Sequence, residues 1–309
     1  MNIEKQIQVF SLKKGAIIRI VYWCNHECHF CHERENIFSL DYRSISLWDL
    51  DAIYAWIEEN NFDYVVISWG EPTLHPQFVD IILYFQSKNI YVVVVNNASY
   101  LHKHDLSQIN KDKITWYVSY HGLEREYNAI TQSTDFKKVT ENILQLSSMF
   151  PEVILRHVVN SINEKTIEEF TKFCLNLSPS IYIEFVLLED LRYQHVKHTF
   201  IPLKDFYIKV LPLLKHQRIF LDWGAACFSP WLFKNAEYKF DPLVNTMRGL
   251  VKKEKNEWII FTLKNSDSPD NIKTQWKKCQ SCVKYRYCHG FDTFYLYNKN
   301  AWVRENDLR

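Results

Sequence analysis

The sequence has few glycines and no long apolar run. Only 6 of its 309 residues are glycine, and no Gly/Ser-rich stretch marks a flexible linker. The strongest apolar run, YVVVV at 91–95, is far too short to cross a bilayer. The first fifteen residues lack the apolar core and cleavage site of a signal peptide. We therefore predict a cytoplasmic protein without a membrane partner.

The chain also lacks an excess of charge of either sign. Lysine and arginine number 37 and aspartate and glutamate 36, which gives a formal net charge of +1. This balance provides no bulk attraction to nucleic acid, so we expect no nucleic-acid partner. The hydrophobic fraction of 47% is that of a folded protein. The length suffices for one large α/β domain with an appendage.

Strand-like and helix-like segments alternate from residue 16 to 188. The strand candidates are rich in β-branched and aromatic residues, and several are apolar throughout, as in a parallel sheet covered on both faces. Helix candidates with apolar residues at helical spacing lie between them. This order indicates a right-handed βα series, either a partial barrel or an open doubly wound sheet. The predicted strands are 16–23, 64–69, 90–96, 114–120, 153–159 and 181–188, and the clearest helices 46–61, 77–88, 135–150 and 163–177.

Past residue 190 the alternation stops. Residues 191–275 give mixed signals, apart from a possible hairpin at 243–263. We therefore divide the chain into a unit at 1–190 and a smaller one at 191–309, joined by a continuous seam.

Eight cysteines remain to be explained. A reducing cytosol makes a disulfide framework improbable, so clustered thiols indicate metal ligands or catalysts. Cys174 stands alone in an amphipathic stretch and is interpreted as core. The other seven form two groups: Cys24, Cys28 and Cys31 near the start, and Cys227, Cys279, Cys282 and Cys288 toward the end.

The first group has the spacing C-x3-C-x2-C directly after the first predicted strand. Three thiolates are too few for a closed zinc site unless His26, His29 or His32 completes it. A thiol-redox pair needs only two cysteines. A [4Fe–4S] cluster held by three cysteines, with one iron open, is the other solution. We favour the cluster because the loop leaves the C-terminal end of a strand, where (β/α) enzymes place their chemistry.

With an aromatic residue before its last cysteine, this loop resembles the cluster loop of the radical S-adenosylmethionine (radical SAM) superfamily. The resemblance implies a partial (β/α)6 TIM-like barrel over residues 1–190. It also implies S-adenosylmethionine (SAM) on the open iron, reductive cleavage to a 5′-deoxyadenosyl radical, and hydrogen abstraction from a substrate. A cytosolic reductant such as flavodoxin or ferredoxin would supply the electron. The histidines are then polar loop residues rather than ligands.

Further segments are similar to the family's motifs in the same order. WGEP at 69–72 is similar to its Gly-Gly-Glu-Pro turn, which binds the amino group of SAM, although Trp69 replaces the first glycine. The indole is expected to cover the cofactor or the substrate. His121 lies at a strand end, and Arg156 shares a face with Ile154 on the predicted strand 153–159. Both are candidates for substrate contact, with structural hydrogen bonding the alternative. The cofactor-binding residues that the resemblance implies are Phe30, Gly70, Glu71, Asn96, Ser119 and Leu187.

The second group offers four thiolates for zinc or for a second cluster. Joined to a radical SAM domain, it resembles the twitch domain, a short form of the SPASM extension. The resemblance implies a small α+β domain at 191–309 holding an auxiliary [4Fe–4S] cluster. Its ligands would be Cys227, Cys279, Cys282 and Cys288.

Relatives with such a domain either modify ribosomally made peptides or oxidise small polar molecules such as aminocyclitols. We favour peptide modification by crosslinking, epimerisation or oxidation, because it is the commoner activity among the relatives. A zinc-stabilised binding module without catalysis is the third alternative.

Overall fold

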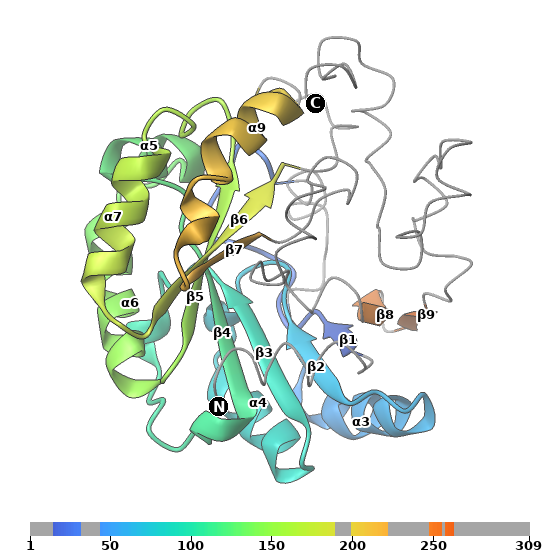
Figure 1. The fold of residues 1–309 in the computed structure, drawn as a ribbon. Helices are drawn as coiled ribbons and strands as arrows, with labels where there is room; N and C mark the ends of the chain where they lie inside the picture. The colour runs from blue at the N-terminus through green and yellow to red at the C-terminus, as the bar shows by residue number, and fades with distance from the viewer. Residues whose placement is uncertain (1–14, 32–43, 189–198, 222–246, 255–256, 263–309) are drawn as a thin grey trace, which may run out of the picture.

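The computed structural model describes residues 15–31, 44–188, 199–221, 247–254 and 257–262 of the chain. Seven parallel strands follow one another across a single curved sheet (Figure 1), and helices alternate with most of them. This confirms an open, partial TIM-like α/β fold. The strands are β1 (Gly15–Ile18), β2 (Tyr64–Ile67), β3 (Tyr91–Asn96), β4 (Ile114–Ser119), β5 (Val153–Val159), β6 (Ile181–Leu187) and β7 (Ile219–Leu221).

The five strands from β2 to β6 match the predicted ranges closely, because each is a short apolar run bounded by polar residues. The first strand is shorter than predicted, ending at Ile18 rather than residue 23. The main helices are α3 (Leu50–Glu59), α4 (Phe78–Ser87), α5 (Glu124–Thr131), α6 (Phe136–Met149), α7 (Ile167–Leu177) and α9 (Leu203–Val210). Of these, α5 and α9 are absent from the predicted helices.

Short 3-10 turns occupy several of the connections. Two of them, η1 and η2, precede the helices α3 and α4. The turn η3 lies in the connection from β3 to β4. The five turns are η1 (Leu47–Asp49), η2 (Pro72–Leu74), η3 (Leu101–Lys103), η4 (Lys111–Lys113) and η5 (Leu213–Lys215).

Two further strands lie at the β1 edge of the sheet. The predicted hairpin is confirmed as β8 (Met247–Glu254) and β9 (Glu257–Thr262), which pair antiparallel. β8 pairs parallel with β1, so the sheet order is β7-β6-β5-β4-β3-β2-β1-β8-β9. Elements from beyond residue 190 therefore flank the sheet on both sides.

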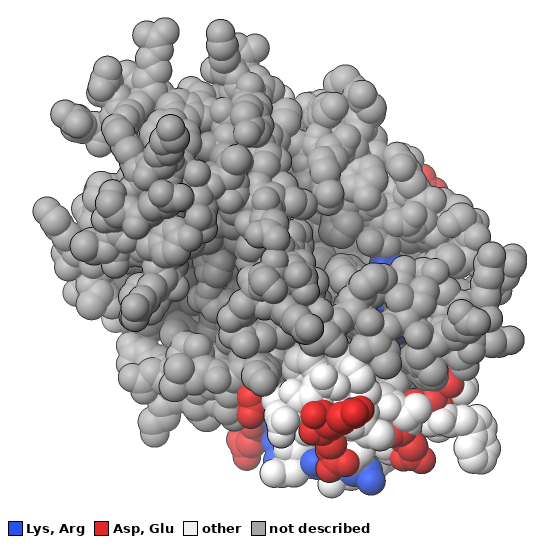
Figure 2. Space-filling view, turned by 90° about the vertical axis from the view of Figure 1, so that its right-hand side faces the viewer, with Lys and Arg blue, Asp and Glu red and all other residues white. Residues whose placement is uncertain are grey.

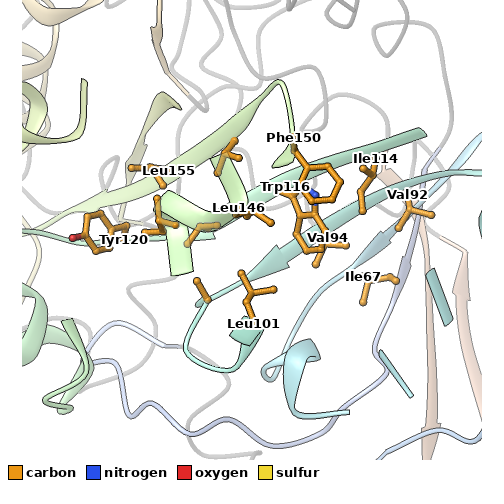
Figure 3. Packing of buried hydrophobic residues seen from close by; sticks show 14 of the residues in the cluster. Ile67, Val92, Val94, Leu101, Ile114, Trp116, Tyr120, Leu146, Phe150 and Leu155 are labelled. Carbon is orange, nitrogen blue, oxygen red and sulfur yellow. The ribbon is translucent and has the colours of Figure 1, made fainter. Parts of the chain in front are cut away.

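The helices pack on one face of the sheet and bury the larger core. Trp116 lies at its centre, fully buried, with its ring 5.3 Å from that of Phe150 (Figure 3). Cys174 belongs to the same core and is fully buried, in agreement with its interpretation as a small apolar side chain.

The opposite, inner face of the sheet carries a second and smaller cluster. Ile17, Val66, Val93, Tyr117 and Ile154 form its centre, one from each of the strands β1 to β5. Residues on the inner face point toward the space that a partial barrel encloses. The C-terminal ends of all seven parallel strands meet at one edge.

The described surface of the chain bears charges of both signs. Figure 2 shows acidic side chains more than basic ones on its described part, so this part of the surface does not attract a polyanion. No helix in the described ranges combines the length and the apolar character needed to cross a bilayer.

Candidate active site

The cysteine loop, residues 24–31, follows β1 at the C-terminal edge of the sheet. Within the described residues, Cys24, Cys28 and Cys31 form no disulfide, and all three are partly exposed. The amide of Cys31 donates to the carbonyl of Cys28 at 3.0 Å, which makes a tight turn between the last two thiols. The second group of predicted ligands, Cys227, Cys279, Cys282 and Cys288, lies outside the described residues.

The electrostatics of these thiols favour binding to a cationic centre. Burial, together with the negative charge of Glu71, raises the pKa of Cys24 to about 12. Burial and the two neighbouring thiols also raise the pKa of Cys28 well above its ordinary value. Such thiols stay protonated at neutral pH unless a metal displaces the protons. The donor set therefore fits a metal centre that supplies positive charge.

The arrangement of the donors fits a cluster better than a single ion. Within the described ranges, no three His, Cys, Asp or Glu side chains surround one point where a single metal ion would sit. A cubane does not need such convergence, because each thiolate binds a different iron. His26 is also engaged elsewhere, since its Nε2 lies 3.0 Å from the carboxylate of Asp135. His32 lies outside the described residues.

The turn after β2, residues 69–72, packs against the segment that leads into the cysteine loop. Trp69 and Gly70 both have positive φ, 66° and 65°. A Cβ on Gly70 would lie 2.5 Å from the carbonyl oxygen of Val21 and 2.7 Å from that of Trp23. Glycine is therefore required here by conformation and by space. The amide of Glu71 then donates to the carbonyl of Trp23 at 2.9 Å, directly before the first cysteine.

The indole of Trp69 lies on the inner side of the sheet. It packs against the inner cluster, and the guanidinium carbon of Arg19 lies 5.1 Å from its ring centroid. A bulky residue at positive φ costs about 1–3 kcal/mol, which surrounding contacts must offset. The ring thus covers part of the inner face near the end of β2.

Glu71 is fixed by three hydrogen bonds although it is almost completely buried. The amide and hydroxyl of Thr73 donate to one carboxylate oxygen, and the amide of Asn97 donates to the other at 2.6 Å. Burial raises its pKa, and these hydrogen bonds oppose the increase. Asn97 also contacts Asn25 at 3.1 Å and the thiol of Cys24 at 3.8 Å. The carboxylate and the cysteine loop are therefore held as one unit.

Of the two adjacent asparagines at the end of β3, only Asn96 was predicted to bind the cofactor, and Asn97 was not. Asn96 is buried and closes a local turn, accepting from the amide of Ala98 at 2.8 Å and donating to the carbonyl of Tyr117. It thereby fixes the end of β3. The two asparagines are adjacent in the sequence but have different partners: Asn97 contacts Glu71 and the cysteine loop, whereas Asn96 contacts the backbone at the ends of β3 and β4.

Three residues, of which Ser119 and Arg156 were predicted, form one row on the inner face. In the register of β4, β5 and β6, Ser119 pairs with Arg156, and Arg156 with Glu184. The Arg156 Nε lies 2.8 Å from a carboxylate oxygen of Glu184, which is completely buried. This ion pair places a charged group inside the partial barrel. Sequence reasoning missed Glu184, although its position between apolar neighbours on a buried strand marks it.

His121 and Phe30 are brought together by the fold. Their rings meet edge to face, with centroids 4.7 Å apart. The Nδ1 of His121 accepts from the amide of Val158 at 3.2 Å, and burial followed by the nearby His157 lowers its pKa well below the ordinary value. His121 is therefore neutral and supports the cysteine loop through Phe30. Leu187, at the end of β6, is buried in the larger core.

The family of this chain follows from a comparison of its sequence with models of known protein families. The sequence model of the Radical SAM superfamily matches residues 18–174, just over half of the 309-residue chain. The chain belongs to the radical SAM superfamily. Enzymes of this superfamily use a [4Fe–4S] cluster and SAM, and the matched region contains the cysteine loop, the turn at Gly70 and the row on β4 and β5.

Curated relatives match about half of this chain, 52%. A protein bearing the name of a glycyl-radical enzyme activating enzyme, from Methanocaldococcus jannaschii, is 25% identical over 175 residues, 52% of this chain and 68% of its own length. Proteins named as GTP 3′,8-cyclases from Saccharolobus islandicus are 27% identical over 169 residues. The match spans only about half the length of these cyclases, 52%.

Solved structures of radical SAM enzymes share the fold. Streptococcus suis SuiB, bound to its precursor peptide SuiA, matches with a TM-score of 0.65 and 15% identity, over 96% of this chain and 76% of SuiB. The enzyme anSMEcpe, with AdoMet and the Cp18Cys peptide bound, matches with a TM-score of 0.58 and 14% identity, over 90% of this chain and 88% of its own. At these identities the likeness concerns the fold alone.

Proposed function

We propose that this radical SAM enzyme modifies a ribosomally made peptide by abstracting a hydrogen atom from it. The observation that carries the proposal is the single unit formed by the cysteine loop, the turn at Gly70 and the buried Glu71. When bound, the [4Fe–4S] cluster and SAM would supply a 5′-deoxyadenosyl radical. Cys24, Cys28 and Cys31 would hold the cluster, which leaves one iron for SAM.

The residues of the chain orient SAM and exclude water. Glu71 presents a carboxylate fixed by Thr73 and Asn97, and the resemblance assigns this turn to the amino group of SAM. Ser119 and Arg156 lie in one row on the inner face. The hydroxyl of Ser119 suits the ribose, and the ion pair of Arg156 with Glu184 gives this part of the face a polar surface. The apolar inner cluster keeps solvent from a reactive radical.

The substrate class is inferred from the neighbours and from the inner face. SuiB and anSMEcpe were both solved with peptides bound, and their folds cover most of this chain. Trp69 and Tyr182 pack at the margin of the inner cluster and are partly exposed, and such aromatic side chains suit the mixed surface of a peptide. We further propose that the four later cysteines hold an auxiliary cluster in a twitch-like domain.

The proposal is tested with anaerobically reconstituted protein, SAM and a chemical reductant. The substrate is a deuterated peptide encoded beside the gene, and 5′-deoxyadenosine is analysed by mass spectrometry. Deuterium in 5′-deoxyadenosine supports the proposal, and its absence with this peptide but presence with a deuterated aminocyclitol refutes the peptide substrate. The Cys24→Ala, Cys28→Ala, Cys31→Ala variant serves as the control and should form no 5′-deoxyadenosine. A colourless protein that binds only zinc would refute both enzymatic alternatives.

A further inference from the structure

The cysteine loop is attached to a second element that no motif describes, the C-terminal end of α5 and the start of its connection to α6. The amide of Glu27 donates to the carbonyl of Thr131, and the amide of His29 to that of Ile130, both at 3.0 Å. The side chain of Gln132 donates back to the carbonyl of Glu27 at 2.6 Å. The residues on either side of Cys28 are thus bound to one turn, about a hundred positions later in the sequence.

A buried pair of side chains completes this attachment. The His26 Nε2 lies 3.0 Å from a carboxylate oxygen of Asp135, and their side chains are only 2% and 15% exposed. The ring of His26 also meets Tyr127 edge to face, with centroids 6.1 Å apart. His26 stands between the first two cysteines, so its position fixes the path of the loop from Cys24 to Cys28.

Asp135 is itself oriented by its neighbours. The hydroxyl of Ser133 donates to Asp135 Oδ1 at 2.5 Å. The Nζ of Lys138, one helical turn later, lies 3.7 Å from Oδ2, the oxygen that faces His26. Asp135 is also the residue that precedes the first turn of α6, where a negative charge is favoured. Although burial opposes ionisation, hydrogen bonds from His26 and Ser133 lower the pKa of Asp135 to about 2. Asp135 is therefore a fixed carboxylate at neutral pH.

We propose that Asp135 is a positioning residue of the metal centre: through His26 it sets the spacing of Cys24 and Cys28, and its charge lowers the reduction potential of the bound cluster. The inference rests on the proposed function, in which these thiolates hold a [4Fe–4S] cluster. A negative charge at this place disfavours an added electron.

Two substitutions separate the hydrogen bond from the charge. Asp135→Asn keeps an oxygen that accepts from His26 but removes the charge, whereas Asp135→Ala removes both. His26→Phe keeps a ring against Tyr127 and removes the donor. Asp112→Asn is the matched control, because Asp112 lies in the turn η4 before β4, at the N-terminal ends of the strands, whereas the cysteine loop lies at their C-terminal ends.

The measurements are iron per chain after anaerobic reconstitution, the electron paramagnetic resonance spectrum of the reduced protein, and a redox titration. We expect Asp135→Ala and His26→Phe to bind at least twofold less iron than wild type. Asp135→Asn should keep its iron, with a more positive potential, and Asp112→Asn should match wild type throughout. Wild-type iron, spectrum and potential in both Asp135 variants would overturn the proposal.

These readouts are independent of turnover. If the variants differ from wild type as expected but wild type never cleaves SAM, the positioning role stands and the proposed function fails. If wild type cleaves SAM and both Asp135 variants keep its iron content, spectrum and potential, the radical SAM activity stands and the positioning role of Asp135 fails. Circular dichroism identifies a variant that does not fold. If Asp135→Ala is such a variant, the reduction potential of the cluster in the isosteric Asp135→Asn variant tests the proposal.

Discussion

Replacing Gly70 by alanine tests the claim that the turn after β2 positions the cysteine loop. The new Cβ would lie 2.5 Å from the carbonyl oxygen of Val21 and 2.7 Å from that of Trp23. Both atoms are backbone, so no side-chain rotation relieves the contact. Alanine at a φ of +65° costs about 1–2 kcal/mol. Forcing the two segments apart adds about 1–3 kcal/mol.

Gly70→Ala should therefore lower the free energy of unfolding by about 2–5 kcal/mol, the sum of these two costs. It should also reduce the iron bound, because the displaced segment runs directly into Cys24. Urea unfolding and iron analysis after anaerobic reconstitution measure the two effects. Trp69→Gly is the control, because it relaxes the neighbouring positive φ and introduces no atom between the segments.

The reasoning is refuted if Gly70→Ala binds as much iron as wild type and unfolds at the same urea concentration. It is also refuted if Trp69→Gly loses as much iron as Gly70→Ala, since a general disturbance of the turn would then explain both.

Three further predictions concern the buried groups. Glu71→Gln places an amide NH2 where Thr73 or Asn97 donates, so it should cost about 1–3 kcal/mol in urea unfolding, and an unchanged midpoint would contradict the hydrogen-bond assignment. Trp116→Ala should cost about 3–5 kcal/mol, whereas the control Trp48→Ala, with a side chain 93% exposed, should stay within about 0.5 kcal/mol. Because burial lowers the pKa of His157 to about 3, the unfolded chain binds a proton that the native chain does not, and stability should fall as the pH drops below 6.5. The slope approaches about 1.4 kcal/mol per pH unit for this group and should be smaller in His157→Phe, as followed by urea unfolding between pH 7 and 5.

The sequence predicted the sheet well because its signal is local. Strands such as 91–96 are continuous β-branched runs, and their order along the chain gives their order in a right-handed parallel sheet. The helix α5 escaped prediction because its sequence, EREYNAIT, is largely polar and carries only a short apolar stripe. Its neighbour α6 has fourteen residues with clear helical spacing and was predicted nearly to the residue.

The site was predictable where one motif contains the chemistry, as with the three thiols and Glu71. It was not predictable where distant residues combine. The contact of His26 with Asp135 joins positions 109 residues apart, and neither residue type nor spacing identifies it. Similarly, Arg156 was selected because it shares a strand face with Ile154, but its buried partner Glu184 depends on the register of β5 and β6.

The flanking strands have a practical consequence for dividing the chain. β7 covers the outer edge of β6, and β8 covers that of β1. A truncation after residue 190 would strip both, leaving two rows of backbone donors and acceptors open to pairing with other chains. We expect such a fragment to aggregate rather than fold as an autonomous catalytic half.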